Sequence, residues 1–157
     1  ELGQQLSGAK PVAINHELST TMFSSRNYSP AGVYAELGRD SDVRSADPHR
    51  LIVLLFEGAE SAIAIARVHA EQGNVAERGS HISKAIDIIA NGLKASLDQQ
   101  QGGELAIRLA ALYDYMVSRL LWANMKNDIP TMDEVHGLLS EIHDAWNQIE
   151  PGKQQTR

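Results

Sequence analysis

The sequence contains no cysteine, and this absence excludes several kinds of chemistry together. Disulfide bonds, thiolate zinc sites, iron–sulfur clusters and cysteine nucleophiles all require that side chain. Aromatic residues make up only 5% of the 157 residues, so a core must be mainly aliphatic. Long apolar runs are also missing, since none approaches the roughly 18–20 residues that span a bilayer. The N-terminus lacks the basic start and apolar centre of a signal peptide. We therefore expect a soluble, cytoplasmic protein without a membrane segment.

Clusters of basic residues are missing as well. The chain has 14 Lys and Arg against 20 Asp and Glu, a formal net charge of −6. Its basic residues stand singly or one helical turn apart, whereas nucleic-acid-binding proteins usually present a basic stripe. The charge pattern therefore predicts no nucleic-acid partner, and the acidic balance favours solubility.

Motifs for catalysis are absent from the chain. Gly102-Gly103 is not followed by Lys-Ser or Lys-Thr, so it does not form a phosphate-binding loop. The chain has no Gly-x-Ser-x-Gly elbow. We therefore predict that the protein is not an enzyme.

Metal and cofactor sites also lack their usual signals. Di-iron bundles carry Glu-x-x-His pairs on two helices, and none of the six histidines has a glutamate three residues before it. His136 and His143 read as a pair on a helix surface. Three further histidines are interpreted as isolated: His49, His69 and His81. The sequence therefore predicts no metal ligands and no cofactor.

What the chain does contain is four apolar stripes with helical spacing. Their apolar residues recur at three- and four-residue steps over Leu51–Ala66, Ile82–Leu97, Leu105–Ala123 and Met132–Ile149. No convincing alternation of strand type appears. Connections of about two to five residues favour antiparallel neighbours with crossing angles of about 20°. We predict an all-α protein, an antiparallel up-down four-helix bundle.

Start and stop signals separate the stripes. Asp47-Pro48 is a helix-start signal, because Asp accepts free backbone N–H groups and Pro suits the first helical position. Two spacings resemble capping boxes, Asn74 with Glu77 and Thr131 with Glu134. The predicted bundle domain spans 46–150, and a polar tail follows over 151–157.

The segment before the bundle, residues 1–45, is predicted to be a flexible N-terminal leader. Residues 1–21 are polar and rich in small side chains. The alternatives for them are a disordered leader, an added segment and upstream reading frame, with Met22 as the expected native start. Tyr28 and Tyr34 stand among Ser, Asn, Pro and Gly, and we predict that they cover a groove of the bundle when no partner is bound.

More apolar residues are present than one bundle seam can bury. On any single helix, we interpret such residues as the edge of a wide apolar stripe that faces the core. Together they indicate surplus apolar surface, mainly on the second and third helices, and hence a groove for another segment. The residues off the main stripes are Val53, Leu54, Ile88, Ile107, Tyr115, Val117, Leu121 and Trp122.

In their order and spacing, several segments resemble the flagellar secretion chaperone family FliS. They include DPHRLIVLLFEGA at 47–59, KAIDII at 84–89, GGELA at 102–106 and LAALYDYM at 109–116, with the late Trp146. The resemblance covers about Tyr28 to Ile149. Near Tyr28 it is only loose.

This resemblance implies a four-helix export chaperone. Such a protein binds the disordered C-terminal region of flagellin in the cytoplasm. It prevents premature polymerisation of flagellin and assists its delivery to the flagellar type III secretion apparatus. A component of the export gate of that apparatus is a further expected partner. Several of the predicted groove residues must also serve the core. The predicted flagellin-binding groove consists of Leu93, Leu97, Leu109, Tyr113, Met116, Val117 and Leu120.

Two other interpretations remain at this point. A generic helical adaptor with another protein client shares all of this physics, and only the ordered family-like segments separate it from the chaperone. A metal-binding four-helix bundle is the second alternative, and the missing Glu-x-x-His pairs argue against it.

Overall fold

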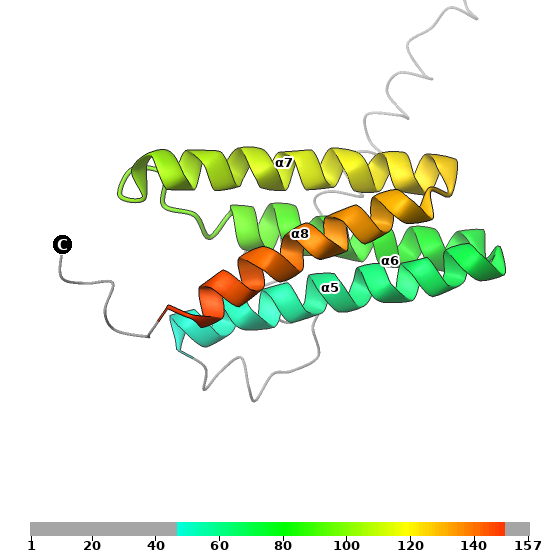
Figure 1. Ribbon diagram of the computed structural model, residues 1–157, viewed down its shortest axis with the longest axis horizontal. Helices are drawn as coiled ribbons and strands as arrows, with labels where there is room; N and C mark the ends of the chain where they lie inside the picture. The colour runs from blue at the N-terminus through cyan, green and yellow to red at the C-terminus, as the bar shows by residue number, and fades with distance from the viewer. Residues whose placement is uncertain (1–46, 150–157) are drawn as a thin grey trace, which may run out of the picture.

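The computed structural model describes residues 47–149, which form the predicted all-α four-helix bundle, with no strand in that range. Successive helices run in opposite directions, so the antiparallel up-down order is visible along the bundle (Figure 1). The helices are α5 Pro48–Gln72, α6 Val75–Asp87 continued by the π-helix η1 Ile88–Lys94, α7 Gly103–Lys126 and α8 Ile129–Asn147. The leader with Tyr28 and Tyr34, and the tail over 151–157, lie outside the described residues.

The start of α5 follows the sequence signal. The Asp47 carboxylate accepts the backbone N–H of Arg50 at 2.8 Å, and Pro48 occupies the first turn. Gly73 ends the helix in the left-handed conformation, with φ of 74°, which glycine adopts without steric penalty. Local chemistry alone therefore determines both ends of this helix.

Neither predicted capping box forms, although Asn74 is the N-cap residue of α6, where the second helix is predicted to begin. The Asn74 side chain makes no cap hydrogen bond, because its amide contacts Gln72 Oε1 and His69 Nδ1 instead. The last helix, α8, begins earlier than Thr131, since Asp128 is its cap and accepts the Thr131 N–H at 3.3 Å. The Thr131 hydroxyl accepts a hydrogen bond from Arg119 across the α7–α8 interface.

The second helix of the bundle, formed by α6 and η1, is not one continuous α-helix. Its last 7 residues form the π-helix η1, in which each turn holds more residues than an α-turn. Ile88, the first residue of η1, is predicted to lie off the main stripe, yet it is only 2% exposed beside the fully buried Ile89. Ile88 therefore belongs to the core and not to the surplus surface.

The core is mainly aliphatic, as the low aromatic content predicts, and all four rods contribute to it. Val53 and Leu54 on α5, also predicted to be surplus, are 5% and 1% exposed. The largest fully buried side chains are Phe56, Leu54, Leu55, Ile63, Ile82, Ile89, Met116, Leu120, Met132, Leu139 and Val135.

Polar contacts join the rods at both ends of the bundle. The buried Arg78 guanidinium of α6 donates to the side-chain and main-chain oxygens of Asn124 and to Asn127 Oδ1. It thereby binds the C-terminal end of α7, where helix carbonyls carry partial negative charge. At the other end, His49 and Trp146 stack at 5.0 Å, and the Trp146 indole donates to the His49 carbonyl.

Candidate functional site

The seven predicted groove residues divide into an interior group and a half-buried group. The interior group is 0–3% exposed and lies in the bundle core: Leu93, Tyr113, Met116 and Leu120. The half-buried group packs against the edge of that core: Leu97, Leu109 and Val117. Unless the helices move, a partner would therefore contact only the second group.

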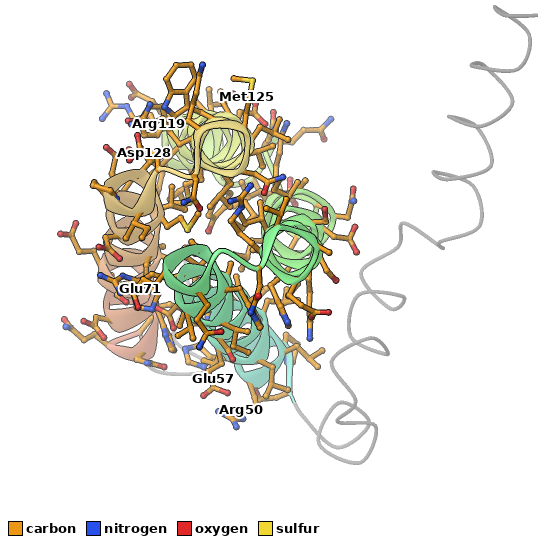
Figure 2. All side chains as sticks on the ribbon, turned by 90° about the vertical axis from the view of Figure 1, so that its right-hand side faces the viewer. Arg50, Glu57, Glu71, Arg119, Met125 and Asp128 are labelled. Atoms are coloured by element: carbon orange, nitrogen blue, oxygen red, sulfur yellow. The ribbon has the colours of Figure 1, made fainter. Side chains whose placement is uncertain are left out.

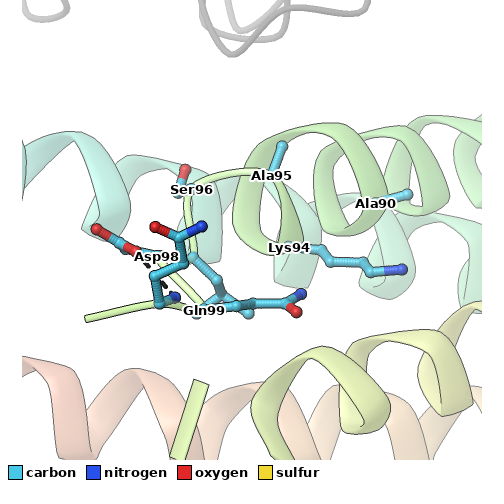
Figure 3. Close-up of a pocket in the computed structure, with 8 residues that line it drawn as sticks. Ala90, Lys94, Ala95, Ser96, Asp98 and Gln99 are labelled. Atoms are coloured by element: carbon cyan, nitrogen blue, oxygen red, sulfur yellow. Dashed lines mark hydrogen bonds between the residues drawn. The ribbon is translucent and has the colours of Figure 1, made fainter. Parts of the chain in front are cut away.

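Leu97 lines an open pocket of about 610 Å³ at the C-terminal end of η1 (Figure 3). The other walls are Ala90 and residues 94–100, and many of these side chains are polar. The Asp98 carboxylate is already occupied, because it accepts the backbone N–H groups of Gln100 and Gln101. This mixed lining suits a short polar contact better than a buried apolar ligand.

The surplus apolar surface lies mainly on the solvent-exposed side of α7, which we call the α7 outward face. It comprises Ile107, Tyr115, Leu121, Trp122 and Met125, whose exposed fractions run from 43% to 68%. Met125 points outward from the bundle end (Figure 2). The residues follow helical spacing, so they share one side of a single rod. Four of the five are large apolar side chains that the core does not use.

Polar contacts border this face on the side toward α8. The Tyr115 hydroxyl donates to Glu134 Oε1 at 2.7 Å, and Arg119 Nε donates to the same oxygen at 3.2 Å. The hydrogen bond from Tyr115 lowers the pKa of Glu134, and the same bond raises the pKa of Tyr115. These contacts hold the Tyr115 ring against α8, while the Lys126 ammonium lies 5.4 Å from the Trp122 ring.

The inward side of α7 offers a contrast. Tyr113, two residues before Tyr115, is 3% exposed. Burial raises the pKa of Tyr113 to about 12 because the interior disfavours the phenolate. One helix thus carries one tyrosine in the core and one tied to a surface carboxylate.

The histidines differ from their predicted roles. His69 and His81, predicted to be isolated, stack with ring centroids 5.6 Å apart, because the turn after α5 brings them together. His49 stacks on Trp146 and is not isolated either. His143 is not a surface partner of His136, since its side chain is 15% exposed and contacts Glu60 at 3.0 Å.

Glu60, Ser140 and His143 could suggest a catalytic group, but their geometry does not support one. The Ser140 hydroxyl donates to Glu60 Oε1 at 2.9 Å, and His143 Nδ1 contacts the other carboxylate oxygen. No hydrogen bond joins Ser140 to His143 within this group, so the imidazole does not activate the hydroxyl. The Phe56 ring stacks on His143, which indicates a structural link between α5 and α8.

None of the helices within residues 47–149 combines the length and apolar character needed to cross a membrane.

Comparison with known proteins gives a consistent result. The family model described as "Flagellar protein FliS" matches residues 31–153. The chain is 54% identical over 126 residues to the flagellar secretion chaperone FliS of Salmonella typhimurium, covering 79% of this chain and 93% of the relative. It is 44% identical over 115 residues to the FliS protein of Escherichia coli, covering 73% and 85%. With the Bacillus subtilis protein of the same name, identity is 33% over 110 residues, covering 70% and 80%.

Proposed function

The chain belongs to the FliS family of flagellar secretion chaperones, and from this premise we propose that it binds the disordered C-terminal region of flagellin in the cytoplasm. By holding that region, it prevents premature polymerisation and assists delivery to the flagellar type III secretion apparatus. A component of the export gate is a further proposed partner. The names of the relatives supply the class of function, and the flagellin segment and its site are our inference.

The observation that carries this proposal is the α7 outward face. A terminal segment without its own core can fold as an amphipathic helix only against an apolar surface. The five residues of the face expose such a surface on a rod that is otherwise held by η1, α6 and α8. We therefore place the main flagellin contact on this face and not in the interior of the bundle.

The length of the face suits a helical client. Ile107 and Met125 are 18 residues apart, which is about 27 Å along a helix at 1.5 Å per residue. A client helix of about 18 residues would match this length. Coupled folding and binding of this kind commonly buries roughly 1,000–3,000 Å², with about 2–5 kcal/mol or more spent on ordering.

The half-buried groove residues extend the proposed contact. Val117 lies one helical turn before Leu121, so it borders the α7 outward face while packing against the core. Leu97 lies at the pocket beside η1, where an extended part of the client would continue. This arrangement gives Val117 and Leu97 roles that the four interior groove residues do not share.

The leader supplies the proposed competitor for the same surface. Tyr28 and Tyr34 are the aromatic residues that we propose cover it when flagellin is absent. In calorimetry with a flagellin C-terminal peptide, the Tyr28→Ala/Tyr34→Ala double variant should bind more tightly than the parent chain. Unchanged affinity would show that these tyrosines do not compete.

The test of the site is titration of the chain with that peptide. Leu121→Glu places a charge on the α7 outward face and should weaken binding about tenfold or more, since burial of an unpaired charge is unfavourable. The matched control is Val75→Glu on α6, because Val75 and Leu121 are 63% and 58% exposed. The control should bind as the parent chain does.

Two outcomes separate the function from its placement. Absence of any stoichiometric complex between the parent chain and the flagellin peptide would overturn the proposed function. A complex that Leu121→Glu and Val75→Glu form equally well would keep the function and overturn the placement on α7. Circular dichroism should show the same helicity for both variants.

A further inference from the structure

Three potential metal ligands meet where α5 turns into α6. Glu77 and His81 lie one turn apart on α6, and His69 lies in the last turn of α5. Each offers one ligand atom, and these atoms all lie within 4.8 Å of one another. Within residues 47–149, this is the one group of three or more such side chains that approach so closely. We propose that His69, Glu77 and His81 form a binding site for a divalent transition metal ion, with Zn²⁺ as the best match.

The donor set supports this assignment. Two imidazole nitrogens and one carboxylate oxygen are common ligands of Zn²⁺, and they leave a fourth position for water. Hard cations such as Mg²⁺ and Ca²⁺ prefer sites made entirely of oxygen ligands. The mixed nitrogen and oxygen donors therefore favour Zn²⁺ over these two ions.

The distances require only small side-chain movements. Ligand atoms around tetrahedral Zn²⁺ are roughly 3.3–3.5 Å apart, given metal–ligand bonds of about 2.0–2.1 Å. Glu77 Oε2 and His81 Nε2 are already 4.0 Å apart. The Glu77 side chain is 62% exposed, so its carboxylate is free to move toward the two rings. All three ligand atoms lie within 4.8 Å of one another, so the remaining contraction is at most about 1.5 Å. Because the His69 and His81 rings are stacked and nearly parallel, one imidazole also turns so that both nitrogens point at the same cation.

The turn holds His69 in position for this role. Its Nδ1 atom lies 3.3 Å from the Asn74 amide nitrogen, and we assign Nε2 to the cation. A metal on Nε2 requires the proton on Nδ1, and the Asn74 amide oxygen can accept that proton after rotation of the amide. A hydrogen bond of this kind on the second nitrogen is typical of metal-binding histidines.

The site joins two helices across one short turn. His69 belongs to α5 and the other two ligands belong to α6, so the bound cation would link the helices across Gly73 and Asn74. The complete ligand set exists only in the folded chain. Zn²⁺ is therefore expected to raise the melting temperature by binding the native state.

The experiment is isothermal titration of the untagged full-length chain with Zn²⁺ alone, followed by thermal melting with and without the metal. The parent chain should bind one Zn²⁺ per chain and melt at a higher temperature in its presence. His81→Ala and His69→Ala should each bind at least about tenfold more weakly and lose the thermal shift, because each removes one ligand of three. Co²⁺ in place of Zn²⁺ gives a visible absorption band that reports the same site.

The matched control is His136→Ala, which removes a histidine of α8 outside the cluster. It should retain the stoichiometry, the affinity and the melting shift of the parent chain. Failure of the parent chain to bind Zn²⁺ saturably would overturn the proposal, and so would equal binding by His81→Ala and the parent. If His69→Ala does not fold, Glu77→Gln at an exposed position provides the second ligand variant, with weaker binding expected.

Discussion

Helices α5 and α7 are nearly equal in length, at 25 and 24 residues, and both carry apolar side chains on more than one side. On α5, even Val53 and Leu54 outside the main stripe are buried. On α7, the corresponding surplus residues Leu121 and Trp122 remain exposed. The difference follows from packing, since α5 contacts α6 and α8 more extensively than α7 contacts any neighbour. Apolar surface that the fold leaves uncovered on α7 is available to a partner.

The largest expected effect comes from the α5 side of this comparison. Phe56 is 1% exposed and stacks on His143 at 5.3 Å. Phe56→Ala should lower the free energy of unfolding by about 3–5 kcal/mol, because it leaves a cavity in a closely packed core. Urea denaturation followed by circular dichroism measures this loss. Phe56→Leu is the control, with an expected loss below about 1.5 kcal/mol.

A loss below about 1 kcal/mol for Phe56→Ala would break the comparison, since α5 would then tolerate truncation as a surface helix does.

An intermediate effect is expected from Tyr113 on the inward side of α7. Its folded-state pKa of about 12 lies above the value of about 10 for an exposed tyrosine. Between these values the unfolded state loses its proton first, so stability should fall as the pH rises from 10 to 12. The expected loss is about 2–3 kcal/mol for a two-unit difference. Denaturant melts across this range should detect it, and Tyr113→Phe should remove it.

The titration of Tyr115 provides a comparison for the titration of Tyr113. Its pKa is also raised, but the first cause is its hydrogen bond to Glu134. Glu134→Gln should therefore change the titration of Tyr115, followed by absorbance at 295 nm, and leave the late titration of Tyr113 in place. If Glu134→Gln moved both tyrosines equally, the inward and outward sides of α7 would not be electrostatically distinct.

The smallest effect is expected on the α7 outward face. Leu121 is 58% exposed, so Leu121→Ser should change the free energy of unfolding by no more than about 0.5 kcal/mol. Thermal and urea melts of the free chain would measure it. A loss comparable to that of Phe56→Ala would mean that Leu121 is needed for the fold, and the proposed docking role would lose its physical basis.

The helices themselves could be predicted because their signals are local. The three- and four-residue spacing of apolar side chains, Asp47 before Pro48, and Gly73 after α5 each act within a few residues. Asn74 is the N-cap of α6, but the predicted capping hydrogen bonds at Asn74 and Thr131 do not form, because both side chains have other partners. Asn74 lies beside His69, and Thr131 lies beside Arg119 from the preceding helix.

The candidate site could be predicted only in part. The surplus of apolar residues on α7 was visible as Ile107, Tyr115, Leu121 and Trp122 outside the main stripe, and these are exposed. Ile88 is predicted to belong to the same group, yet it lies in the core. The spacing of apolar residues does not predict the π-helix that begins at this residue.

The sequence by itself determined four amphipathic helices, their order, their approximate ends and the family to which they belong. The apolar periodicity and the capping and turn residues act over one or two helical turns, so the sequence alone is enough to identify them. Only the tertiary structure decided which apolar side of α7 stays open and which histidines meet at the α5–α6 turn. The burial of a side chain and its distance to another side chain depend on residues that are far apart in the sequence or separated by a turn. The spacing of residues along the chain does not predict these contacts.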